Sequence, residues 1–250
     1  MQMFSQAFTK VRLLWLTHIG SLLPLAWLVW DYATNNLTVN PIQEITFRTG
    51  KPALVLLVLS LAVTPLNTIC AWREIVPTRK WLGLYAWGYV TLHFLIFIGL
   101  DYGFSWGLIY EALFEKRYAL VGFLALLILT PLAITSTKGW QRRLGKRWKR
   151  LHQLVYAAGL LGVFHYLWLV KSDIREPLAW GLVVLLLLAA RIPRVRKKLV
   201  AWRVRFTGRT TPLGRSKQGD GLSKSVASSA AKVTAHPHPT SPSLLTITHK

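Results

Sequence analysis

Long apolar runs separated by short polar stretches dominate the first 190 residues of the chain. Most runs approach the roughly 20 residues that a helix needs to cross the hydrocarbon core of a bilayer. We expect six membrane-spanning helices, near residues 13–30, 52–70, 81–100, 118–135, 148–170 and 177–190. The pattern predicts an all-α integral membrane protein, in which a six-helix transmembrane bundle (13–190) follows a short cytoplasmic N-terminus (1–12).

The charges between the runs predict how the bundle is oriented. Lysine and arginine gather before the first run, after the second and after the fourth, where seven cations lie between Lys138 and Arg150. The opposite loops hold most of the acidic residues, among them Glu111 and Glu115. Because cytoplasmic loops are enriched in Lys and Arg, we expect both termini inside the cell and parallel third and fifth spans.

Composition narrows the class of protein further. With 52% hydrophobic residues, 12 Trp and only 9 acidic side chains, the chain is too apolar for an ordinary soluble domain. Membrane topology explains the net charge of +22 better than nucleic-acid binding does. Cys70 is the single cysteine, so the sequence contains no CxxCH motif and any haem is held without thioether links. The first helix shows no cleavage site, and we expect it to remain as an anchor.

Two further features complete the layout. Thr64-Pro65-Leu66 is echoed by Thr130-Pro131-Leu132, which suggests a two-helix hairpin used twice, with the histidine-bearing helix second. Residues 191–206 form a basic juxtamembrane segment that we expect along the anionic inner leaflet, with docking of an acidic partner as the alternative. Residues 207–250 are rich in Gly, Ser, Thr and Pro and are expected to be a disordered cytoplasmic tail.

Three histidines lie inside the predicted spans: His93, His152 and His165. An unpaired polar group costs several kcal/mol in a bilayer core, so buried histidines there commonly have a function. Counted at 1.5 Å per residue from Gly83 and Gly145, His93 and His152 lie within about 5 Å of one depth, and His165 roughly 15 Å further out. This count predicts haem between the third and fifth spans, with His93 and His152 as its two axial ligands.

The number of haems stays open at this point. Three ligands cannot form two independent bis-histidine sites, so His165 either shares a second haem with another kind of ligand or binds none. The alternative for each histidine is a hydrogen bond to a neighbouring helix. His18 is expected at the interface, and His236, His238 and His249 in solvent.

The long stretches RKWLGLYAWGYVTLHFLIFIGLD and LTPLAITSTKGWQRRLGKRWKRLHQLVYAAGLLGVFHYLWLVKSD resemble the MsrQ (YedZ) family, the haem-binding membrane subunits of bacterial periplasmic methionine-sulfoxide reductase systems. The resemblance runs from the second span to Asp173 and implies a ferric-reductase-like transmembrane domain in the inner membrane. It implies b-type haem, one or two per chain, and FMN as a further cofactor. The family's haem-associated histidines fall on His93, His152 and His165.

The resemblance also implies the partners. Electrons would reach a periplasmic molybdopterin methionine-sulfoxide reductase that repairs oxidised proteins. Relatives among the oxidases carry a flavin and nicotinamide domain, but this tail has no GxGxxG motif. The electrons would therefore come from a cytoplasmic flavin reductase or the quinone pool, and the chain would be an electron-transfer subunit without substrate chemistry of its own.

Two other functions remain open on the sequence. A stand-alone transmembrane ferric or metal reductase would need an acidic metal-collecting surface beside an outer haem. A cofactor-free transporter or structural membrane protein would carry paired charges inside its spans, and the predicted spans show none.

Overall fold

A computed structural model describes the backbone of residues 2–170 and 173–207. This part of the chain consists of helices joined by turns, without any strand, which confirms the prediction of an all-α fold. The predicted tail, apart from its first residue, and the three tail histidines lie outside the described residues. The helices are α1 (Gln2–Ala33), α2 (Pro41–Cys70), the short η1 (Arg73–Ile75), α3 (Thr78–Ile96), the π-helix η2 (Phe97–Asp101), α4 (Trp106–Glu115), α5 (Arg117–Ile134), α6 (Lys138–Leu144), α7 (Lys146–His152), α8 (Val155–Leu169), α9 (Arg175–Ala189) and α10 (Pro193–Thr207).

The second helix begins eleven residues before the apolar run that predicted it. Pro41 stands in its first turn, where a missing N–H costs nothing, and the Asn40 side chain caps the helix by accepting from the N–H of Gln43. The extra turns carry Arg48, which pairs with Glu44 and with the buried Asp31 near the end of α1. Asp31, Glu44 and Arg48 thus form a charge cluster at one end of the bundle. The predicted spans did not include these residues.

Among the described residues, four helices are long and apolar enough to cross a membrane: Phe8–Ala33 of α1, α2, the continuous η1–α3–η2 segment and α5. Helices α9 and α10 together meet the same criterion but are bent by 83° at the break between them, so the total is up to five if this pair counts as one span. The predicted fifth span is divided into α7 and α8, and α8 has only 15 residues. The count of six spans stays a prediction.

The core of the bundle lies where α2, α3, α5 and α8 meet. Three buried alanines pack together there: Ala53 of α2, Ala86 of α3 and Ala158 of α8. Larger side chains from α2, α3 and α5 complete this cluster. Small residues let helix backbones approach closely, which drives helix association in lipid. A second cluster joins Leu54 and Val58 of α2 to α8 and α9. Helix α2 is therefore the element on which the others are assembled.

Helix α1 packs against both α2 and α3, and hydrogen bonds from Tyr89 attach it to α3. The hydroxyl of Tyr89 accepts from the N–H of Leu25 and donates to the carbonyl of Ser21. These two groups are four residues apart, and Pro24 lies between them. The Tyr89 hydroxyl therefore bonds two backbone groups of α1 beside the proline. A proline disturbs the helix hydrogen bonds around it, so groups of a neighbouring helix commonly bond the freed backbone atoms.

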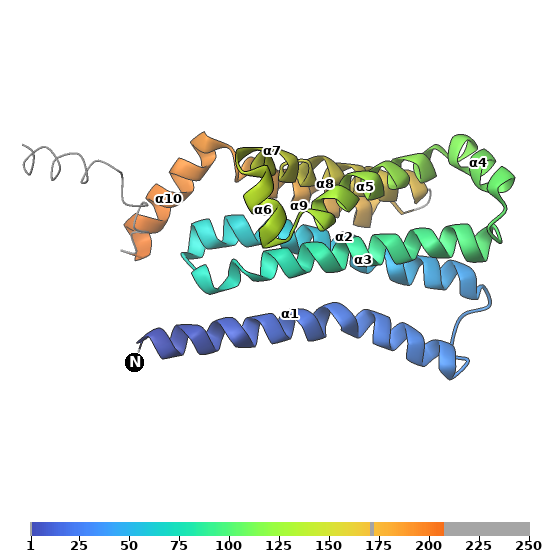
Figure 1. Cartoon of the computed structure of the whole chain (residues 1–250), viewed down its shortest axis with the longest axis horizontal. Coiled ribbons are helices and arrows are strands. Elements are labelled where there is room, and N and C mark those ends of the chain that lie inside the picture. Colours follow the sequence, from blue (N-terminus) through green and yellow to red (C-terminus); the bar gives the residue numbers. More distant parts are fainter. Residues whose placement is uncertain (1, 171–172, 208–250) are drawn as a thin grey trace, which may run out of the picture. The chain divides into compact units, whose positions relative to one another are not determined.

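The ends of the bundle differ in charge. The turn from α2 to α3, α6, α7 and the start of α10 lie toward one end, and the α1–α2 loop and α4 toward the other (Figure 1). The first end carries Arg73, Arg79 and Lys80 and the cations of α6 and α7, and the second carries Asp31, Glu44, Glu111 and Glu115. The fold thus keeps the charge asymmetry predicted from the sequence.

Candidate functional site

His93 of α3 and His165 of α8 lie side by side within the bundle. Their ring centroids are 6.2 Å apart and their planes stand at 85°. Both side chains belong to helices that form hairpin-like pairs, α3 with α2 and α8 with α5. The structure therefore brings together two of the three predicted ligands, on helices that correspond to the third and fifth predicted spans.

The structure does not place His93 beside His152, the pair that the depth count predicted. The ring of His152 is stacked on Trp148 instead, with centroids 4.0 Å apart. The depth count treated residues 145–170 as one helix, but the chain turns at Gln153 and Leu154 and α8 begins at Val155. His165 of α8, rather than His152, therefore lies level with His93, as the contact of their rings shows.

Each of the two paired histidines is oriented by a backbone carbonyl of the neighbouring helix. Nδ1 of His93 lies 3.0 Å from the carbonyl oxygen of Thr46, and Nδ1 of His165 lies 2.7 Å from that of Tyr118. A carbonyl can only accept, so Nδ1 carries the proton in both rings and the lone pair of the neutral imidazole is on Nε2. This is the arrangement that metal-binding histidines commonly show.

The separation of the rings suits two axial ligands of one iron. An imidazole nitrogen binds a metal at about 2 Å, and the ring centre lies roughly 1 Å behind it, so opposed ligands have centroids about 6 Å apart. The observed 6.2 Å agrees with this distance. Across the described residues no group of three or more His, Cys, Asp or Glu is placed to hold a bare metal ion. His93 and His165 would instead hold the iron of a haem, which would supply one-electron redox chemistry.

Aromatic side chains surround the histidine pair. Phe94 of α3 stacks on Phe123 of α5 with centroids 5.3 Å apart, and the ring of Tyr118 lies 6.2 Å from that of His165. The hydroxyl of Thr49 lies 3.4 Å from Nδ1 of His93. Hydrogen bonds thus satisfy both Nδ1 atoms, and an aromatic ring lies beside His165.

Sequence reasoning missed the groups that orient the imidazoles. The acceptors at Thr46 and Tyr118 are backbone carbonyls, which no residue type reveals. One signal was present in the chain: both carbonyls precede their histidine by 47 residues. The predicted hairpin repeat, based on the two Thr-Pro-Leu motifs, did not use this spacing.

His152 lies elsewhere, near the basic end of the bundle. Its Nδ1 lies 3.2 Å from the carbonyl oxygen of Trp148, one turn earlier. Its Nε2 is buried, and among the described residues it has no hydrogen-bond partner. The indole of Trp148 is itself fixed by a 2.9 Å bond to the carbonyl of Thr135. His152 therefore presents an oriented imidazole away from the other pair, with the carbonyl of Leu132 near enough to interact with its ring.

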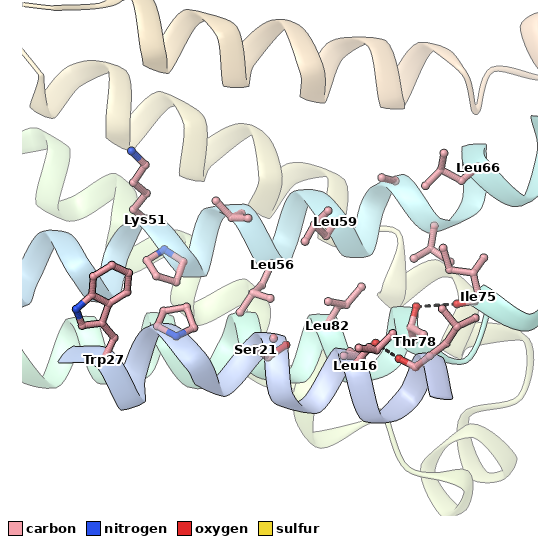
Figure 2. A pocket seen from close by; sticks show the side chains of 18 of the residues that line it. Leu16, Ser21, Trp27, Lys51, Leu56, Leu59, Leu66, Ile75, Thr78 and Leu82 are labelled. Atoms are coloured by element: carbon pink, nitrogen blue, oxygen red, sulfur yellow. Dashed lines mark hydrogen bonds between the residues drawn. The ribbon is translucent and has the colours of Figure 1, made fainter. Parts of the chain in front are cut away.

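A separate cavity of about 720 Å³ lies between α1 and the helices α2 and α3. Figure 2 shows its largely apolar lining, with Leu16 on α1, Leu56 and Leu59 on α2, and Leu82 on α3. The amine of Lys51 at its edge points away from it and binds Glu176 of α9 at 2.7 Å. None of the three candidate histidines lines this cavity, which is apolar enough for hydrocarbon.

Comparison with known proteins identifies the family to which the chain belongs. The family model described as "Ferric reductase like transmembrane component" matches residues 21–163, which include His93 and His152 and end two residues before His165. The chain therefore belongs to the ferric-reductase-like transmembrane proteins.

Relatives define the family more closely. A protein of Xanthomonas axonopodis pv. citri is 44% identical over 203 residues, covering 79% of this chain and 91% of the relative. One of Rhodospirillum rubrum is 45% identical over 182 residues, covering 72% and 88%. Both bear the name protein-methionine-sulfoxide reductase heme-binding subunit MsrQ. Within its class, the chain is a member of this MsrQ family.

Proposed function

We propose that this chain binds haem through Nε2 of His93 and Nε2 of His165 and passes electrons across the membrane to a methionine-sulfoxide reductase. The observation that carries the proposal is the pair of imidazoles 6.2 Å apart, each with Nδ1 bonded to a carbonyl. Haem would supply one-electron oxidation and reduction at this site. Since both axial positions would be taken by histidine, the site suits electron transfer rather than oxygen binding.

The protein's own residues contribute orientation and exclusion of water. The carbonyls of Thr46 and Tyr118 fix the ring tautomer and make the ligand nitrogens more basic, which favours the oxidised iron. The apolar residues of the helices that carry the two histidines would limit the access of water to the haem. The haem would be held without thioether links, because the sequence has no CxxCH motif, and the family resemblance supports the b type.

A second haem ligated by His152 is the further part of this proposal. The buried and unpartnered Nε2 of His152 supports it, since a buried polar atom without a partner calls for an explanation. Its second ligand would not be one of the other two predicted histidines, which are paired with each other. Two haems at different depths would provide a path along the bundle.

We infer the direction of flow from charge and from the relatives. The basic end would face the cytoplasm by the positive-inside rule, as would both termini. Electrons would enter there from a flavin reductase or from the quinone pool. They would leave at the opposite, periplasmic end to a molybdopterin catalytic subunit, a partner that family resemblance supports together with the inner membrane as location. FMN rests on that resemblance alone.

Visible spectroscopy of the purified full chain tests the haem site. The parent should show the bands of low-spin b-type haem, and His93→Ala should lose most of them. His18→Ala is the matched control, because the His18 ring is bonded to the Tyr85 hydroxyl at 2.9 Å, outside the paired site. A colourless parent after haem-sufficient expression would exclude the redox function and favour the cofactor-free alternative.

The rate at which different acceptors reoxidise the reduced protein identifies its electron acceptor. The reduced protein should be reoxidised faster by its methionine-sulfoxide reductase with methionine sulfoxide than by ferric chelates. Faster reoxidation by the chelates would support the stand-alone metal reductase instead.

A further inference from the structure

The surroundings of His93 and His165 are two copies of one arrangement. The first set consists of the Thr46 carbonyl, Gly50 and His93, and the second of the Tyr118 carbonyl, Gly122 and His165. Each member of the second set lies 72 positions after its counterpart in the first. In both sets the glycine follows the carbonyl by four residues on one helix, and the histidine comes from the next membrane helix of the pair.

The glycines touch the imidazoles. A Cβ added at Gly50 would lie 3.1 Å from Nδ1 and from Cε1 of His93. A Cβ added at Gly122 would lie 2.8 Å from Nδ1 and 2.9 Å from Cε1 of His165. Both rings therefore rest on bare backbone, and the approach at Gly122 is closer than a side chain permits.

Helix geometry explains why glycine stands four residues after each carbonyl. The carbonyl of residue i accepts the N–H of residue i+4 in the helix, and the side chain of residue i+4 lies over that turn. With glycine there, a second donor from another helix can reach the same oxygen. The Nδ1–H of each histidine is this second donor, at 3.0 and 2.7 Å.

We propose that Gly50 and Gly122 are positioning residues for the two haem ligands, and that the site is built from two copies of one carbonyl-glycine-histidine unit. The inference rests on the proposed ligation by His93 and His165. Neither glycine would touch the iron. Each would act by leaving room for an imidazole and uncovering the carbonyl that orients it.

The test is a set of alanine variants of the full chain, measured by haem retained on purification and by low-temperature EPR. Loss of an outer-shell partner typically weakens metal binding 10–100-fold, so Gly122→Ala should retain haem roughly ten-fold less tightly, with an altered low-spin signal. Gly50→Ala should show the same change to a smaller extent, because its contact is longer.

Two glycines on the histidine helices serve as matched controls. Gly88 of α3 has nothing within 4 Å of an added Cβ, and Gly162 of α8 would meet only Leu54 Cδ1 at 3.6 Å. Gly88→Ala and Gly162→Ala should keep the parent's haem content and signal. If Gly122→Ala also keeps both, the positioning role is refuted. If His93→Ala and His165→Ala keep them as well, the ligation itself has failed.

A double variant covers the case in which Gly122→Ala does not fold. Removing the imidazole removes the clash, so the His165→Ala, Gly122→Ala double variant should recover the folded yield of His165→Ala. A double variant as poorly folded as Gly122→Ala alone would show that the methyl group acts elsewhere, and would overturn the inference.

Discussion

Arg191 shows at the residue scale how the bundle accommodates a proline inside a span. Pro65 of α2 has no N–H, so it cannot bond the carbonyl of Leu61, four residues earlier. Arg191, just after α9, donates from Nη2 to that carbonyl at 2.7 Å and from Nη1 to the Tyr156 hydroxyl at 2.6 Å. One guanidinium thus replaces the missing helix bond and ties α2 to α8.

Replacing this side chain should destabilise the protein. We expect Arg191→Leu to cost about 1–2 kcal/mol and to lower the thermal unfolding midpoint in detergent, because the freed carbonyl loses a charged donor. The exposed Arg194 provides the control, and Arg194→Leu should leave the midpoint unchanged. In a Pro65→Ala background the helix can close its own bond, so the effect of Arg191→Leu should shrink. An equal effect in both backgrounds would contradict this account.

At the scale of elements, the chain divides between α7 and α8, and His152 and His165 fall on different sides of this break. The basic run from Lys138 to Arg150 contains good helix formers, and nothing in it required a stop before the apolar segment. The structure nevertheless ends α7 at His152 and restarts at Val155. In the structure His165, rather than His152, lies beside His93.

Cysteine labelling locates the start of the fifth span. In a Cys70→Ser background, Gln153→Cys should react with a water-soluble maleimide from the cytoplasmic side, because residue 153 precedes α8. Leu160→Cys, on an exposed and apolar face of α8, should not react. If Gln153→Cys is protected like Leu160→Cys, the span begins near Trp148 as hydropathy predicted.

The helices also show which features of the fold could be predicted from the sequence. Apolar runs predicted where α2, α3 and α5 cross, since burial in lipid is decided by composition over a long window. Helix ends depended on single capping groups such as Asn40, which hydropathy does not register. The three candidate histidines could be named from the chain, but their pairing depended on a two-residue turn and their orientation on backbone carbonyls.

At the scale of the whole molecule, the basic and acidic ends of the bundle predict its orientation. In the same Cys70→Ser background, Arg147→Cys should be labelled only from the cytoplasmic side and Glu111→Cys only from the periplasmic side. Both positions are exposed. The reverse pattern would invert the proposed direction of electron flow.

Low-temperature EPR of the purified full chain tests most directly that His93 and His165 hold one haem together. We predict that His93→Ala and His165→Ala abolish the same low-spin signal, whereas His152→Ala leaves that signal in place and affects at most a second one. Loss of one common signal in His93→Ala and His152→Ala, with His165→Ala unchanged, would contradict the account and restore the pairing suggested by the depth count.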